Sequence, residues 1–257
     1  MKGRPLRFQL ALIGHLVRRE FVLSYRRSTL GFLWSLLLPL AQLLVLVLVF
    51  DTIVPLGIPR YPAFVFSGLL PWTWFSTCVS MACGLFITNR DLVRHPDFRP
   101  AVLMVVTAIA GMITYLAALP ILLVVMVTHG QWIGPAVLFF PVLGLIEGVL
   151  IVGLGLLVAT LNVFYRDIQY LTGVGLMLLF YLTPVFYRPP DATRGGLGLL
   201  YDLNPMAGLV QGYRAIFFDG TMPSLLALGI ATALSSLLAL VGYAVYRRSE
   251  HDMIDAL

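Results

Sequence analysis

Residue types that carry chemistry are sparse in this sequence of 257 residues. Lys2 is the only lysine and no GxxxxGK[ST] loop occurs, so the chain cannot cradle and hydrolyse ATP by itself. Its four histidines lack metal-ligand spacing. Cys78 and Cys83, five apart in an apolar run, are interpreted as small packing residues. We therefore expect no catalytic residue, no metal and no cofactor bound by this chain.

Glu147 is the one ionisable side chain deep within an apolar run, GLIEGVLIVGLG. A carboxylate is expensive in such surroundings, so we expect it to face protein or a wet cavity, or to be protonated. Three roles are open: structural hydrogen bonding, a place at a channel or subunit interface, and proton coupling. A proton relay would require further groups of this kind, and none is visible.

A second charged feature, Arg166 and Asp167 in LNVFYRDIQY, separates two long apolar runs. The pair is interpreted as a tight turn between two membrane spans. It is either a topology marker or a point that stays rigid and touches a partner, without a part in catalysis.

Composition indicates an all-α membrane protein. The sequence is 60% hydrophobic and only 11% charged, whereas a soluble domain carries about a quarter charged residues. Apolar runs of about 20 residues suit helices that cross a ~30 Å hydrocarbon core. Six transmembrane helices are predicted, at Leu30–Val54, Pro62–Ile87, Ala101–Thr128, Pro135–Phe164, Ile168–Phe186 and Met222–Tyr246.

Orientation follows from the placement of basic residues. Thirteen of the seventeen Lys and Arg residues fall on one side of the predicted spans, which predicts cytoplasmic N- and C-termini. The net charge of +5 is thus a topology signal, and no nucleic-acid partner is expected.

We expect a single transmembrane domain over residues 1–257. It comprises a cytoplasmic interfacial helix (1–29), a six-span bundle (30–246) with an external gate segment (188–221), and a cytoplasmic tail (247–257). The gate segment breaks at Asn204–Pro205, which favours two short helices that re-enter or lie on the outer leaflet.

The N-terminal helix is predicted to be amphipathic and to contact membrane lipids. Its apolar stripe and its arginines are Leu6, Leu10, Ile13, Val17 and Phe21, and Arg18, Arg19, Arg26 and Arg27. The helix is either a topogenic anchor or a surface helix that also contacts a cytoplasmic partner.

The loop NRDLVRHPDFRP, residues 89–100, is short, charged and bounded by prolines. It is either a solvated turn or a short docking helix that offers Leu92 and Val93 to a groove on another protein. The candidate coupling residues in it are Arg90, Asp91, Leu92, Val93 and Arg94.

Five ordered segments carry a resemblance across nearly the whole chain. They are RREFVLSYRRSTLGFLWSLLLPL (18–40), FSGLLPWTWFS (66–76), LNVFYRDIQYL (161–171), FYLTPVFY (180–187) and LNPMAGLVQGYRAIFFDG (203–220). Together they resemble the permease subunit of type-2 ABC exporters that move polysaccharides, the O-antigen, teichoic acid and capsule transporters.

The resemblance implies a homodimer of six-span subunits with two copies of a separate ATPase, which holds ATP and Mg. It implies a coupling helix at Asn89–Arg99, an interfacial helix at Leu6–Arg27 and gate helices within Leu197–Phe218. It also implies a channel lined by aromatic residues of the first and fifth spans, with Phe32, Trp34, Phe180, Tyr181 and Tyr187 as candidates.

The expected function is that of the membrane subunit of an ATP-driven exporter of a lipid-linked polysaccharide in the cytoplasmic (inner) membrane. One alternative is a type-2 ABC permease for a drug or lipid. A membrane-embedded transferase would need an acidic or histidine cluster that the sequence lacks. A passive channel or scaffold would not bind an ATPase.

Overall fold

The computed structural model describes residues 6–25, 30–131, 134–189, 198 and 201–257, and in the first helix it describes the side chains of residues 11–22. The described residues are helical and contain no strand. The elements are α1 (Leu6–Tyr25), α2 (Leu33–Val47) with its π-helical continuation η1 (Leu48–Ile53), α3 (Tyr61–Thr88), α4 (Arg90–Val93), α5 (Ala101–Thr128), the 3-10 turn η2 (Pro135–Phe139), α6 (Phe140–Phe164), α7 (Ile168–Leu182), α9 (Pro205–Arg214), the π-helical η3 (Ala215–Asp219) and α10 (Leu225–Ala256).

Five described helices are long and apolar enough to cross a membrane. They are Leu33–Ile53, Tyr61–Thr88, Ala101–Thr128, Pro135–Phe164 and Leu225–Ala256. The third and fourth have the predicted bounds, and the first two differ by at most three residues. The last begins three residues later than predicted and continues through most of the segment predicted to be a tail. Arg247 and Glu250, which pair at 2.8 Å one turn apart, support that extension.

The predicted fifth span is shorter than expected. Helix α7 has 15 residues, or about 22 Å at 1.5 Å per residue, which is less than a ~30 Å hydrocarbon core. It ends at Leu182 because Thr183 precedes Pro184, and a residue before proline favours extended backbone. The described helices therefore establish five candidate spans and leave the six-span prediction unconfirmed.

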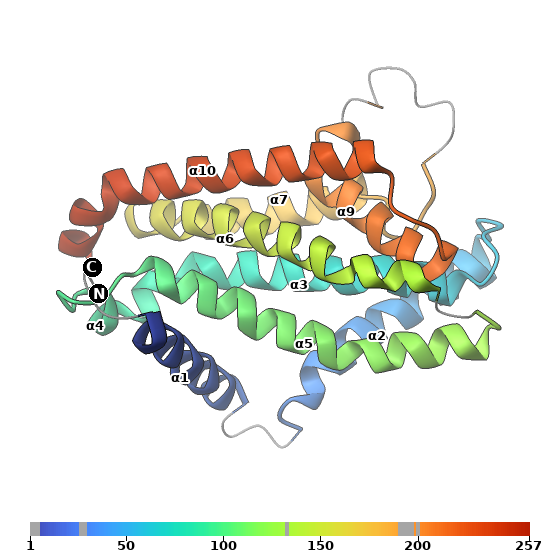
Figure 1. Cartoon of the computed structure of the whole chain (residues 1–257), viewed down its shortest axis with the longest axis horizontal. Helices are drawn as coiled ribbons and strands as arrows, with labels where there is room; N and C mark the ends of the chain where they lie inside the picture. The colour runs from blue at the N-terminus through green and yellow to red at the C-terminus, as the bar shows by residue number, and fades with distance from the viewer. Residues whose placement is uncertain (1–5, 26–29, 132–133, 190–197, 199–200) are drawn as a thin grey trace.

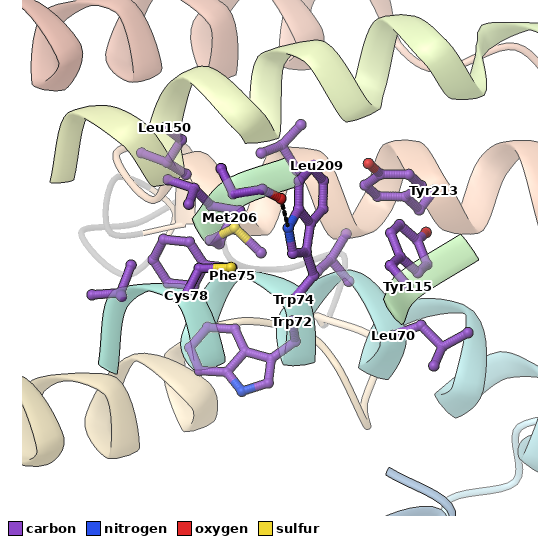
Figure 2. Packing of buried hydrophobic residues seen from close by; sticks show 14 of the residues in the cluster. Leu70, Trp72, Trp74, Phe75, Cys78, Tyr115, Leu150, Met206, Leu209 and Tyr213 are labelled. Carbon is purple, nitrogen blue, oxygen red and sulfur yellow. Dashed lines mark hydrogen bonds between the residues drawn. The ribbon is translucent and has the colours of Figure 1, made fainter. Parts of the chain in front are cut away.

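Helix α3 is the centre of the bundle. It packs against α2, α5, α6, α7 and α9, and its side chains supply much of the buried core. Figure 2 shows Trp74 of α3 beside Tyr115 of α5 and near Tyr213 of α9, with the indole Nε1 donating to the Ala108 carbonyl at 3.1 Å. This hydrogen bond satisfies a polar group that would otherwise be buried without a partner.

Helices α6 and α10 approach most closely through glycine. A Cβ atom on Gly242 would overlap the backbone of Gly153, and one on Gly153 would overlap that of Ala239. Small residues at such positions let membrane helices pack backbone against backbone. This seam fixes the last span to the core.

The two ends of the bundle differ in what they carry. Figure 1 shows the start of α1, the C-terminus and α4 at one end, which we call the termini end. Helix α9, η3 and the start of α10 lie toward the other, which we call the opposite end.

Helix α1 packs against α5 and is amphipathic in the part whose side chains are described. Val17 is buried and Ile13 and Phe21 are half-buried, whereas Arg18 and Arg19 are exposed. This part agrees with the predicted stripe. The structure does not describe the side chains of the other predicted members, which are Leu6, Leu10, Arg26 and Arg27.

Candidate functional site

A group of rings lies toward the opposite end of the bundle, where η1, α3 and α7 meet. This aromatic cluster comprises Phe50, Trp72, Phe180, Tyr181, Phe186, Tyr187 and Tyr201. Phe186 is central to it: its ring centroid lies 5.2 Å from that of Phe50, 5.6 Å from that of Phe180 and 5.0 Å from that of Tyr187. Offset and edge-to-face pairs at these distances stabilise one another beyond their burial.

Three of the five predicted channel residues meet in this cluster. The rings of Phe180 and Tyr181 lie 5.6 Å apart, and the Tyr187 hydroxyl donates to the Tyr181 carbonyl at 3.0 Å. Tyr187 and Tyr201 join their hydroxyls at 2.9 Å. Because Tyr181 is 61% exposed, the cluster presents ring faces and hydroxyl groups on the surface of the bundle. Such a surface suits sugars, whose C–H faces are apolar and whose hydroxyls need hydrogen bonds.

The other two predicted channel residues lie elsewhere in the chain. Phe32 packs near Phe21 of α1, with centroids 6.2 Å apart. Trp34 is half-exposed and lines a cavity of about 300 Å³ between α1, α2, α3 and α5. Within one chain these two rings are therefore separate from the aromatic cluster. Phe50, Trp72 and Tyr201 were missed by sequence reasoning, because only tertiary packing brings their distant positions to α7.

The segment after α7 is held in place by α9. Asn204 caps α9 by accepting from the Met206 amide at 3.0 Å, and its own amide group donates to the Thr183 hydroxyl at 2.9 Å. Pro205 follows at the first helical position, where proline's fixed φ favours helix initiation. The predicted break at Asn204–Pro205 is therefore the start of a short helix, while most of the segment before it lies outside the described residues.

Arg214 makes the second connection from α9. Its Nη2 donates to the carbonyls of Pro184 and Val185 at 2.8 and 2.9 Å, and its guanidinium lies 3.7 Å from the Phe64 ring centroid. The side chain is 5% exposed. Burial, with the nearby Arg188 charge, lowers the pKa of the Arg214 guanidinium to about 9, which still leaves it positive at neutral pH. A buried cation thus fixes the backbone that carries Phe186 and Tyr187.

The predicted coupling loop forms α4 at the termini end. Arg90, Asp91 and Arg94 are exposed, and Arg90 and Asp91 form only a long 3.9 Å ion pair. Val93 is 1% exposed within this chain, and Leu92 is partly buried against the same core. For Val93 the expectation that it is offered to a partner therefore needs correction, because it anchors α4 to the bundle. For the half-buried Leu92, docking to a partner stays a prediction, and the charged side chains form the free surface of α4.

Arg166 and Asp167 lie in a turn between α6 and α7, and both are exposed. The hydrogen bonds that fix this turn to the bundle come from Asn162 instead. Its amide group donates to the Cys83 carbonyl of α3 at 2.6 Å, and its oxygen accepts from the Gln169 amide at 3.1 Å. Asn162 was missed by sequence reasoning. The available signal was a lone amide side chain in an apolar run, since such a group must find partners.

Glu147 is fully buried on α6. Its carboxyl group lies near Tyr213, and Tyr115 faces the same buried region, but among the described residues neither carboxylate oxygen has a partner at proper hydrogen-bond geometry. Their rings meet edge to face at 5.8 Å. In a single chain Glu147 therefore faces no channel and no surface. Because an isolated charge is very costly in such surroundings, we expect the neutral acid there.

These features define a multi-pass helical membrane protein with an aromatic surface toward one end and exposed charged elements at the other. Among its described residues no group of acidic, histidine and cysteine side chains is arranged to hold a metal ion. Residues 11–218 match the model of the ABC-2 type transporter family. The chain belongs to this family.

Curated relatives match along most of their length. The O-antigen export system permease protein RfbA of Myxococcus xanthus is 34% identical over 249 residues, which cover 96% of this chain and 95% of the relative. The polysialic acid transport protein KpsM of Escherichia coli is 23% identical over 96% of both chains. The capsule polysaccharide export inner-membrane protein CtrC of Neisseria meningitidis serogroup B is 26% identical over 83% of this chain and 81% of the relative.

Proposed function

We propose that this chain is the membrane-spanning subunit of an ATP-driven exporter that moves a lipid-linked polysaccharide across the cytoplasmic membrane. The observation that carries the proposal is the 34% identity to an O-antigen export permease over 96% of the chain. The relatives named above export or transport different surface polysaccharides, which supports a glycan over a drug or a simple lipid as the substrate.

The aromatic cluster would provide the surface along which the glycan moves. Each ring offers an apolar face to a sugar, and the hydroxyls of Tyr181, Tyr187 and Tyr201 supply hydrogen bonds to it. Transport requires contacts that are strong enough to admit the substrate and weak enough to release it. A surface of uncharged aromatic rings meets this condition better than a charged site that binds tightly.

We propose that two copies of the chain enclose the channel. Helix α7 has no buried residue in the single chain, and α2 buries only Pro39 and Leu43. Apolar faces of this extent must contact lipid or another protein. A second copy of the chain is a natural partner, since two-fold pairs are the commonest homo-oligomers. In such a pair α7 and the Thr183–Tyr187 segment would together act as the fifth of six crossings.

An ATPase subunit would bind at the termini end. The chain has no nucleotide-binding loop of its own, so the energy must come from a separate protein. Helix α4 and the Arg166–Asp167 turn expose charged side chains there, and the excess of basic residues on this side supports a cytoplasmic location for it. Closure of the ATPase dimer would press on both elements and separate α2 from α7 across the pair.

The proposal is tested by deleting the gene and following the glycan. We expect the surface polysaccharide to disappear and its lipid-linked form to accumulate inside the cell. Export should return with the wild-type gene and fail with Phe180→Leu combined with Tyr181→Leu. The matched control is Tyr243→Leu, an exposed tyrosine of α10 outside the cluster, which should restore export.

The same experiment separates the polysaccharide exporter from a permease for a drug or lipid. Normal surface glycan in the deletion strain would refute the proposed substrate. Normal export by the Phe180→Leu, Tyr181→Leu variant would not contradict the proposed substrate. It would refute the role of the aromatic cluster in moving the glycan. Co-purification of the chain with an ATPase, followed by ATPase activity that rises with lipid-linked glycan, distinguishes an exporter from a passive channel.

A further inference from the structure

A second cavity lies between α9, η3 and the start of α10. Figure 1 shows these elements toward the opposite end of the bundle. It measures about 370 Å³, and its polar lining includes Arg188, Arg214, Gln211, Thr221 and Ser224. Gly220, whose φ of 65° favours glycine, turns the chain from η3 toward α10 between the lining residues Asp219 and Thr221. No role proposed above uses this cavity.

The cavity brings together two guanidinium groups. The Arg214 and Arg188 carbons lie 3.7 and 5.3 Å from the centroid of the same ring, that of Phe64. Among the described residues of the lining Asp219 is the only acidic one, and it pairs with Arg188 at 3.6 Å. Two positive charges thus face one negative charge, and the described lining keeps a net positive charge.

Arg214 is not fully satisfied by the chain itself. Its Nη2 donates to two backbone carbonyls, but its buried Nε has no hydrogen-bond partner among the described residues. A buried charged donor without a partner is unfavourable unless something else accepts its hydrogen bonds. Because Arg214 is nearly buried and lines the cavity, an acceptor inside the cavity would meet this need.

The remaining walls also offer donors. Helix α10 is 32 residues long and begins beside the cavity, with Ser224 as its N-cap and Ala227 and Leu228 in the lining. Ser224 Oγ accepts from the Ala227 amide at a long 3.5 Å, so the first turn keeps much of its capacity to bind an anion. Thr221, which carries a hydroxyl group, is also part of the lining. Guanidinium groups, hydroxyls and a helix N-terminus are the groups that hold phosphate oxygens.

The surroundings of the cavity favour a lipid as the source of the phosphate. Met222, Leu225 and Leu226 are 61%, 79% and 77% exposed, and α10 is one of the candidate spans. These side chains would contact acyl chains beside the cavity, while the polar lining faces the headgroup. The volume also exceeds that of a lone phosphate and leaves room for a glycerol or sugar next to it.

We propose that this cavity binds the phosphate group of a membrane lipid headgroup, with Arg188 and Arg214 as its cationic side chains. The proposal does not depend on polysaccharide export. It has a consequence for the aromatic cluster, however, because Arg214 holds the Pro184 and Val185 carbonyls next to Phe186. A bound headgroup would hold Arg214 in place and steady that segment.

The test uses the full chain, purified in detergent, and measures lipid affinity by native mass spectrometry. Phosphatidylglycerol is compared with a diacylglycerol of the same acyl chains, so that only the phosphate-containing headgroup differs. We expect a clear preference for phosphatidylglycerol. Arg188→Gln should weaken its binding about tenfold, since a charge-assisted hydrogen bond is lost. Arg60→Gln, an exposed arginine outside the cavity lining, should leave it unchanged.

Asp219→Asn separates a binding site from a merely structural cluster. Removing this carboxylate frees Arg188, so phosphatidylglycerol should bind more tightly, whereas a variant that only damaged the fold would bind more weakly. Competition by inorganic phosphate, weaker than the lipid but with the same order of variants, would support the headgroup interpretation. Equal binding of phosphatidylglycerol and diacylglycerol, or an Arg188→Gln variant with wild-type affinity, would overturn the proposal.

Discussion

Arginines at the two ends of the bundle differ in how the chain uses them. At the opposite end Arg214 is 5% exposed, lies against Phe64 and holds two backbone carbonyls. At the termini end Arg90, Arg94 and Arg166 are exposed, and the only ion pair that these three form within the described part of the chain, Arg90 with Asp91, is long at 3.9 Å. The difference indicates that the opposite end uses arginine to build its own structure, while the termini end leaves it available to a partner.

The largest effect should follow the loss of the buried arginine. Arg214→Ala removes the donor to the Pro184 and Val185 carbonyls and leaves both without it, so we expect about 2–5 kcal/mol less free energy of unfolding. Thermal unfolding in detergent measures this change. Arg60→Ala, an exposed arginine just before α3, should change stability by less than about 0.5 kcal/mol. Equal melting temperatures for the two variants would show that burial of Arg214 does not contribute to the stability of the opposite end.

A smaller loss of stability should come from the turn between α6 and α7. Asn162→Ala leaves the Cys83 carbonyl and the Gln169 amide without this partner, for an expected cost of about 1–3 kcal/mol. Gln169→Ala is the matched control, because the Gln169 side chain is exposed and only its backbone takes part. If both variants unfold together with the wild type, Asn162 does not fix the turn.

Loss of the exposed Arg166–Asp167 pair in the same turn should impair function and leave stability almost unchanged. Arg166→Ala with Asp167→Ala should change the free energy of unfolding by no more than about 0.5 kcal/mol, because both side chains are exposed. We expect the double variant to lose the coupling between ATP hydrolysis and export, measured with the assembled transporter in liposomes. Normal coupling would show that the pair serves only topology.

The smallest effect on stability is expected for α4. Arg90→Ala with Arg94→Ala should leave unfolding unchanged and weaken binding of the ATPase subunit, with a difference that shrinks as salt is raised. Affinity measured at low and high ionic strength checks this, with His95→Ala as an exposed neighbouring control. A loss of affinity that does not depend on salt would indicate that α4 docks through its apolar side chains after all.

The fold class and the approximate spans followed from composition and from the lengths of the apolar runs. A helix that crosses the bilayer must be about 20 residues long and mostly apolar, and both properties can be read directly from a sequence. The bounds Ala101–Thr128 and Pro135–Phe164 are identical in prediction and structure. The aromatic run around Pro184 was also visible, since its members are sequence neighbours. Recognition of the family rested on ordered local segments, which do not require a structure.

Other features depended on contacts between distant residues. Val93 is apolar and sits in a charged loop, so sequence alone cannot say whether it faces its own core or a partner, and the fold buries it. Arg166 and Asp167 drew attention as charges, yet Asn162 holds the turn because it reaches Cys83, 79 residues away. Likewise Arg188 and Arg214 are 26 positions apart in the sequence, and it is their packing against the Phe64 ring that brings both charges to one cavity. Periodicity and composition report how each segment meets lipid or water, whereas the partner of a single polar group is set by tertiary packing.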